Sequence, residues 1–88
     1  MNILQIDRTE MSTPLGKHKL GLLINVHLAD RCDDVVLMRK HAVELLRKEN
    51  VKKYAGVSVV YWLQREGRRE RLYMHDFSTS TIDPPRTG

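Results

Sequence analysis

Residues 19–28 read KLGLLINVHL, and an apolar side chain stands at every second position of this stretch. Because successive side chains of a β-strand point to opposite faces, the alternation predicts a strand with one face toward a core. That face carries Leu20, Leu22, Ile24, Val26 and Leu28. The opposite face mixes polar residues with Leu23, so it is not a purely solvent-facing surface.

An amphipathic helix is predicted directly after this strand. Asp30 is placed to cap its first turn, because a carboxylate there accepts hydrogen bonds from free backbone amides. At helical spacing one stripe is apolar and the opposite stripe is charged, and the helix is expected to end near Asn50. The apolar stripe comprises Cys32, Val35, Met38, Ala42, Leu45 and Leu46. This stripe predicts that one helix covers one face of a sheet.

Two further segments, residues 57–64 and 70–77, are rich in β-branched and aromatic side chains. They flank a short polar loop centred on residues 66–69, which predicts a β-hairpin. With residues 2–6 as a short first strand, the predicted order is β-β-α-β-β. The fold class is therefore α+β, a two-layer sandwich with one helix packed on one face of a mixed four-stranded sheet. The order of the strands within the sheet is left open.

The length of 88 residues fits one domain. We expect residues 1–77 to form it and residues 78–88, with their Ser, Thr and Pro, to be an extended or flexible arm. The polar stretch of residues 13–16 is expected to be a loop. Cys32 is the only cysteine, and no run approaches the ~20 apolar residues that span a bilayer, so a cytoplasmic location without membrane contact is predicted.

The hairpin is the part of the chain that suggests a partner. If its strands pair symmetrically about the loop, Tyr61 lies opposite Met74 beneath the helix, and Trp62 lies opposite Tyr73 on the other face. Each large aromatic side chain buries ~150 to 250 Å², so several on one open face exceed the apolar patch that a monomer usually exposes. A second copy of the chain commonly covers such a face. The predicted homodimer interface consists of Leu23, Val60, Trp62, Tyr73, His75 and Phe77.

The formal net charge is +4, and residues 39–71 hold ten Lys or Arg against four Glu. A basic segment favours a polyanion partner such as nucleic acid. Two modes are left open: a single strand whose bases stack on the open sheet, or projecting hairpins that contact a duplex. The predicted nucleic-acid-binding residues are Arg65, Arg68, Arg69, Arg71, Trp62 and Tyr73. Helix cations such as Lys40 and Arg47 are expected in the layer opposite the open sheet face, and a helix C-terminus also favours cations.

Other chemistry has weaker support. His27, Cys32 and the neighbouring aspartates are metal-ligand types, but strand alternation and helix capping account for them, so neither a metal site nor a cofactor is predicted. The chain has no phosphate-binding glycine loop and no GxSxG elbow, and a small enzyme is the third alternative. We therefore expect a non-enzymatic, homodimeric protein that binds nucleic acid. The second alternative is a protein-interaction module, an inhibitor or adaptor, that uses the aromatic sheet face.

Overall fold

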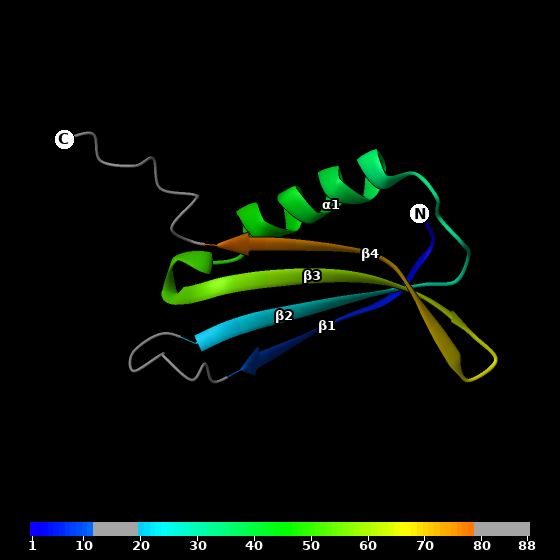
Figure 1. The fold of residues 1–88 in the computed structure, drawn as a ribbon, viewed down its shortest axis with the longest axis horizontal. Helices are drawn as coiled ribbons and strands as arrows, with labels where there is room; N and C mark the ends of the chain where they lie inside the picture. Colours follow the sequence, from blue (N-terminus) through cyan, green and yellow to red (C-terminus); the bar gives the residue numbers. More distant parts are fainter. Residues whose placement is uncertain (12–19, 79–88) are drawn as a thin grey trace.

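The computed structural model describes residues 1–11 and 20–78, and its elements follow the predicted β-β-α-β-β order (Figure 1). The strands are β1 (Ile3–Met11), β2 (Leu20–Leu28), β3 (Tyr54–Arg65) and β4 (Arg68–Ser78). The helix α1 (Val35–Lys48) and a short 3-10 turn, η1 (Val51–Lys53), connect β2 to β3. The predicted loop at residues 13–16 and the predicted arm beyond Ser78 lie outside the described residues.

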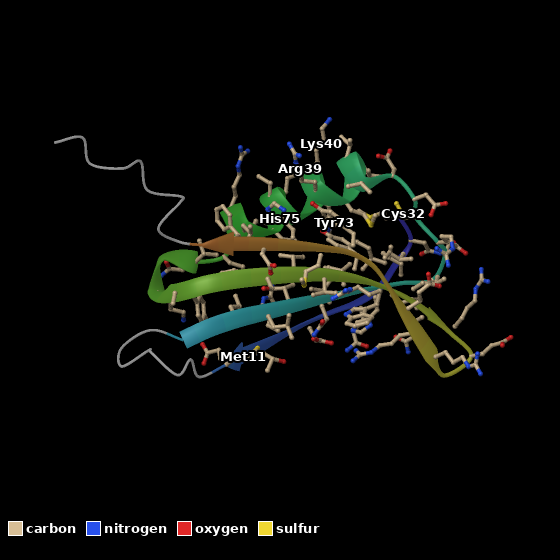
Figure 2. All side chains as sticks on the ribbon, viewed as in Figure 1. Met11, Cys32, Arg39, Lys40, Tyr73 and His75 are labelled. Atoms are coloured by element: carbon tan, nitrogen blue, oxygen red, sulfur yellow. The ribbon has the colours of Figure 1, made fainter. Side chains whose placement is uncertain are left out.

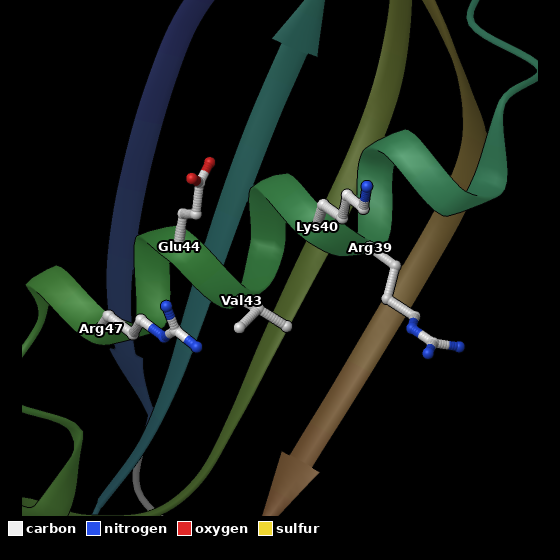
Figure 3. Close-up of a pocket in the computed structure, with 5 residues that line it drawn as sticks. All are labelled: Arg39, Lys40, Val43, Glu44 and Arg47. Atoms are coloured by element: carbon white, nitrogen blue, oxygen red, sulfur yellow. The ribbon is translucent and has the colours of Figure 1, made fainter.

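The four strands form one mixed sheet in the order β1-β2-β3-β4. The outer pairs β1–β2 and β3–β4 are antiparallel, whereas the central strands β2 and β3 are parallel and adjacent. A parallel neighbour requires a crossover connection, and α1 supplies it. The helix lies across one face of the sheet (Figures 1 and 3). The predicted α+β class, with one helix on a mixed four-stranded sheet, is confirmed.

The hydrophobic core lies between α1 and the sheet face beneath it. Alternate residues of the two central strands point into this core, as period-2 alternation requires. They are Leu22, Ile24, Val26 and Leu28 of β2 and Val57, Val59, Tyr61 and Leu63 of β3. Met38, Ala42 and Leu46 of α1 pack onto them at the i, i+4, i+8 spacing of one helix face. We refer to this sheet face as the helix face and to the other as the open face.

The helix begins at Val35, later than predicted, because its N-cap is Asp34 and not Asp30. The Asp34 carboxylate accepts a hydrogen bond from the backbone N–H of Leu37 at 3.0 Å. Asp30 lies in the connection that leads from β2 to the helix layer, and its carboxylate accepts from the Asn2 side chain at 3.4 Å. Cys32 consequently precedes the helix, although it still packs against the core.

The β3–β4 hairpin turns through two residues, where a loop centred on four was predicted. Glu66 and Gly67 both have positive φ, 49° and 74°, which is the signature of a type I′ turn. Near the turn, Arg65 pairs with Arg68 and Trp62 pairs with Arg71. The next pair is Tyr61 with Tyr73, so Leu72 is an extra residue in β4, a β-bulge.

This bulge reverses the faces predicted for the rest of β4, because one inserted residue sends every later side chain to the other side. Tyr73, His75 and Phe77 pair with residues of the helix face. Figure 2 shows Tyr73 and His75 on the side of the sheet that α1 covers. The prediction that these three side chains share the open face with Leu23, Val60 and Trp62 is therefore wrong. Met74 and Asp76 take their place there, opposite Val60 and Ser58.

In the ranges 1–11 and 20–78, no helix is long and apolar enough to span a membrane. Helix α1, with 14 residues, is shorter than the ~20 that a span needs and carries charged residues along its length.

Candidate nucleic-acid interface

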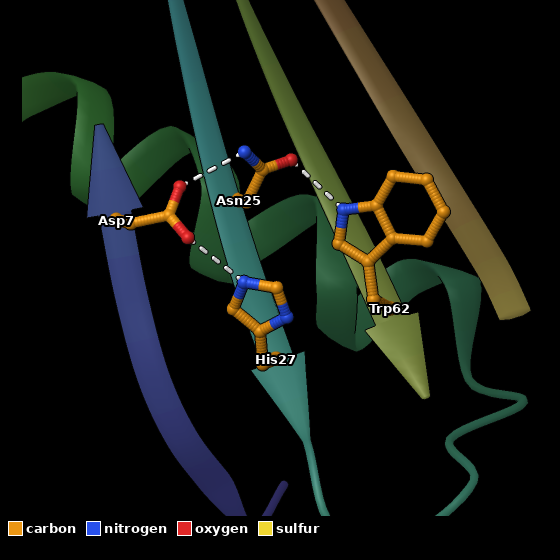
Figure 4. Close-up of polar contacts among 4 residues, drawn as sticks. All are labelled: Asp7, Asn25, His27 and Trp62. Atoms are coloured by element: carbon orange, nitrogen blue, oxygen red, sulfur yellow. Dashed lines mark hydrogen bonds and ion pairs between the residues drawn. The ribbon is translucent and has the colours of Figure 1, made fainter. Parts of the chain in front are cut away.

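Polar side chains from three strands form a hydrogen-bonded network on the open face (Figure 4). The indole Nε1 of Trp62 donates to Oδ1 of Asn25 at 2.8 Å, and Nδ2 of Asn25 donates to Oδ1 of Asp7 at 2.9 Å. An indole only donates and a carboxylate only accepts, so these neighbours determine the orientation of the Asn25 amide. The network therefore determines the orientation of the Trp62 side chain on the open face.

Asp7 anchors this network from β1. Its second oxygen, Oδ2, accepts a hydrogen bond from Nε2 of His27 at 2.9 Å. The hydrogen bonds from Asn25 and His27 lower the pKa of Asp7 below its ordinary value, because both stabilise the carboxylate. The other ring nitrogen of His27, Nδ1, is buried and has no hydrogen-bond partner within the described ranges. The carboxylate thus holds two side chains of β2 at once.

A cation lies over the Trp62 ring. The guanidinium carbon of Arg69 is 4.1 Å from the ring centroid, a distance typical of a cation–π contact. Arg69 belongs to β4, and Arg71 of the same strand is the register partner of Trp62. By strand alternation, Arg69 and Arg71 share the open face with Trp62. This face therefore combines a fixed aromatic ring with two arginines.

The remaining two hairpin arginines occupy the other side of the β3–β4 tip. Arg65 and Arg68 pair across the turn and, by alternation, lie on the helix face. The hairpin tip that carries them extends beyond the N-terminal end of α1 (Figure 1). A shallow depression of about 430 Å³ adjoins them. Its lining residues include Arg31, Arg65, Arg68, Arg69 and Glu70. We define the arginine hairpin as the β3–β4 tip that carries Arg65, Arg68, Arg69 and Arg71.

Glu70 forms an ion pair with Arg31, a residue outside the hairpin. Its Oε1 is 2.5 Å from Nη2 of Arg31, which follows β2, and this hydrogen bond lowers the pKa of Glu70. All four arginines of the arginine hairpin are exposed. Among residues 1–11 and 20–78, no carboxylate forms an ion pair with any of the four. Arg69 acts on Asp7 over a longer distance and helps to lower the pKa of that carboxyl, whereas Arg65, Arg68 and Arg71 have no carboxylate partner among the described residues. The positive charge of these three arginines is therefore available to a ligand.

The predicted binding residues are brought together with one exception. Arg65, Arg68, Arg69, Arg71 and Trp62 gather at the hairpin, whereas Tyr73 lies on the helix face, its ring centroid 6.0 Å from that of Tyr61. The Tyr73 hydroxyl is 3.3 Å from Nδ1 of His75. Tyr73 therefore belongs to an aromatic cluster under α1 and is not part of the hairpin surface. The predicted dimer interface is likewise divided between the two faces.

Three residues of the site were not predicted. Asp7 lies in the second half of β1, which was expected to end at Ile6. Asn25 stood at a polar position of the 19–28 alternation, and that position was the only signal of its role. Arg31 was not assigned any role, because its partner Glu70 is far away in sequence and only the fold brings the two together.

Three basic residues of α1 form a separate group on the outer side of the helix. Arg39, Lys40 and Arg47 surround Val43 and Glu44 at a shallow depression of about 320 Å³ (Figure 3). Arg39 and Lys40 point away from the sheet (Figure 2). These cations lie in the layer opposite the open face, as predicted. The positive charge is thus divided between the arginine hairpin and the helix.

Within the described part of the chain, no group of three or more His, Cys, Asp or Glu side chains could hold a metal ion. No family model, curated protein or solved structure matches the chain. A function is therefore inferred from the fold and from the side chains of the hairpin.

Proposed function

We propose that this protein is a small, non-enzymatic nucleic-acid-binding protein of the cytoplasm that contacts phosphate groups through its arginine hairpin. One observation carries the proposal: four exposed guanidinium groups stand on one hairpin, and none forms an ion pair with a carboxylate of the described residues. Guanidinium groups donate two parallel hydrogen bonds to phosphate oxygens, which makes arginine the side chain best suited to this contact.

The pairing of Glu70 with Arg31 supports this reading. By strand alternation Glu70 shares the helix face of the hairpin with Arg65 and Arg68, where its negative charge would offset theirs. The ion pair directs its charge toward Arg31 instead. Each phosphate that an arginine neutralises releases condensed counterions, so cations without a protein partner contribute most to binding.

The placement of the arginines on both sides of a two-stranded ribbon suits an extended polyanion. Arg69 and Arg71 face the open side, while Arg65 and Arg68 face the opposite side. Phosphates are spaced along a nucleic acid, so a ribbon with cations on both sides reaches several of them at once. A small anion would occupy at most one or two of these groups.

Homodimerisation through the open face is not needed for this function. The open face lacks the predicted aromatic patch, because Tyr73 and Phe77 pack on the helix face instead. Of the predicted interface residues, Leu23, Val60 and Trp62 share the open face. Val60 is already buried, however, and Trp62 is hydrogen-bonded to Asn25 of the same chain. The proposal therefore applies equally to a monomer.

A protein-interaction module is the second candidate, and it is favoured by apolar side chains on α1. Val35, Val36 and Leu37 in the first turn are 50%, 63% and 41% exposed, whereas Met38, Ala42 and Leu46 of the same helix are buried. This reading replaces the aromatic sheet face with the outer surface of the helix. It predicts binding that is insensitive to salt.

Fluorescence anisotropy of a labelled oligonucleotide tests the main proposal. The double variant Arg68→Ala/Arg69→Ala is compared with Arg39→Ala/Lys40→Ala, which removes the same charge from the outer side of α1. We expect the hairpin variant to bind about tenfold more weakly or worse, and the helix variant to stay close to wild type. Equal losses in the two variants, or no binding by wild type, would overturn the proposal.

A further inference from the structure

Trp62 stands on a sheet face that no described element covers. Helix α1 packs on the opposite face, and the Trp62 side chain is only partly buried. Its position is determined by Asn25, which is in turn held by Asp7 (Figure 4). An exposed aromatic ring that is already immobilised loses little conformational freedom when a flat ligand stacks on it.

The outer surface of the ring is occupied by a group that can be exchanged. Arg69 covers the indole at 4.1 Å, but its side chain is exposed and no described carboxylate pairs with it. At a solvent-exposed site, stacking of a nucleobase on an aromatic ring is stronger than a cation–π contact. A base can therefore replace the guanidinium over Trp62.

The displaced Arg69 guanidinium can still contact the nucleic acid at the same site. Arg69 retains its charge when it leaves the ring, and Arg71 lies beside Trp62 in the strand register. Both groups are within side-chain reach of the sugar-phosphate links that flank a base on Trp62. One exchange thus gains a stacked base and a phosphate contact together.

From this arrangement we infer that the ligand is single-stranded nucleic acid, with one unpaired base stacked on Trp62 in place of Arg69. The inference rests on the proposed function and specifies its ligand. Bases of a duplex are stacked on one another inside the helix and do not offer a free surface to the ring. A duplex would meet only the arginines.

Trp62 is the only tryptophan, so its fluorescence reports on this one site. Wild-type protein is titrated at low salt with a single strand, with the matching duplex, and with an abasic strand of the same length and charge. We expect the single strand to quench the fluorescence strongly. The abasic strand and the duplex should bind while leaving most of it unchanged. The single strand should also bind about tenfold more tightly than the abasic strand.

Variants separate stacking from charge. Trp62→Leu should lose about 10- to 100-fold in single-strand affinity and little in abasic-strand affinity. The matched control is Tyr73→Leu, an aromatic residue on the helix face, which should keep the preference for single strands. Circular dichroism checks that both variants fold, and the wild-type quenching comparison stands by itself if one does not.

The outcomes for the two proposals are distinct. Equal affinity for single and abasic strands, with salt-dependent binding retained and no quenching, would overturn the stacking inference while leaving phosphate binding in place. The same conclusion would follow if the duplex quenched as strongly as the single strand. Absence of binding to all three ligands would overturn the proposed function as well.

Discussion

Arg31 and Glu70 form an ion pair, with 2.5 Å between Nη2 and Oε1, that joins the connection after β2 to the β4 strand of the arginine hairpin. Arg31 also lies 3.9 Å from a carboxylate oxygen of Asp33, at the limit of an ion pair. The shorter contact engages a carboxylate that lies on the helix face of the hairpin together with Arg65 and Arg68. Arg31 therefore influences the charge of the hairpin without being part of it.

Glu70→Gln tests this relationship. The substitution removes the charge that occupies Arg31 and so adds one available cation beside the hairpin. Binding to nucleic acid should tighten, and the slope of log affinity against log salt should steepen by roughly 0.7 to 0.9, the value for one more phosphate contact. Glu44→Gln changes the same charge on the outer side of α1 and should have little effect. Equal effects of the two substitutions in an anisotropy titration would contradict the role of Arg31.

Asp7→Asn tests the hydrogen-bonded network of the open face. The pKa of Asp7 is lowered in the folded protein, so its carboxylate stabilises the fold above its ordinary pKa of about 4. This contribution is lost as pH falls through the lowered value. The carboxylate is partly exposed, so we expect wild type to exceed the variant by less than about 1 kcal/mol at pH 6. Urea unfolding should show that the difference in unfolding free energy between wild type and Asp7→Asn shrinks toward pH 3. A difference that does not change with pH would contradict the lowered pKa of Asp7.

The partial burial of His41, which contacts Tyr61, predicts a second pH effect. Burial lowers the pKa of His41, so the folded state favours its neutral form. The stability from this preference is fully present above about pH 6.5, the ordinary pKa of histidine, and is lost as pH falls through the lowered value. Unfolding free energies at pH 7.5 and 5.5 should therefore differ more for wild type than for His41→Gln. Equal pH dependence would show that His41 is as easily protonated in the folded as in the unfolded chain.

The buried hydroxyl of Tyr61 allows a further test of the same contact. This side chain is fully buried, and its hydroxyl oxygen is 2.7 Å from Nδ1 of His41. Tyr61→Phe removes both the hydroxyl and its need for a partner and should cost about 1 kcal/mol of unfolding free energy. His41→Leu leaves the hydroxyl buried without its partner and should cost more, about 1 to 3 kcal/mol. The reverse order in urea unfolding would contradict the hydrogen bond.

The two-residue turn of the arginine hairpin can be improved. Glu66 adopts a φ of 49°, which is unfavourable for a residue with an ordinary side chain, whereas Asn tolerates it well. Glu66→Asn should raise the unfolding free energy by roughly 0.5 kcal/mol. Gly67→Ala should lower it by about 1 kcal/mol, because φ is 74° there although nothing crowds the added methyl group. Thermal unfolding of both variants measures the two shifts, and shifts of the same sign would contradict the type I′ geometry.

The fold could be predicted from sequence where apolar periodicity determines it. The alternation through Ile24 and Val26 defined β2 and its buried face, and the spacing of Met38, Ala42 and Leu46 defined the helix. The helix start was placed too early because several aspartates precede the helix, and any of them can cap it. Local sequence does not determine the length of the connection between β2 in the sheet and α1 in the helix layer.

The charged residues of the site could be predicted from the sequence, but the sheet face on which each side chain lies could not. The arginines of the hairpin are adjacent in sequence, so a turn at Glu66 and Gly67 necessarily gathers them. The bulge at Leu72 has no sequence signature, and it decides on which face Tyr73 lies. The partners of Trp62 come from β1 and β2, and only the strand order β1-β2-β3-β4 brings them beside it.

Measuring affinity for a single-stranded oligonucleotide across a range of salt concentrations tests the central claim most directly. If the arginine hairpin neutralises phosphates, log affinity falls linearly with log salt. In Arg68→Ala/Arg69→Ala the slope should be smaller than in wild type by roughly 1.4 to 1.8, while Arg39→Ala/Lys40→Ala should keep the wild-type slope. Equal slopes for the wild type and the hairpin variant would contradict the claim that these arginines bind the nucleic-acid backbone.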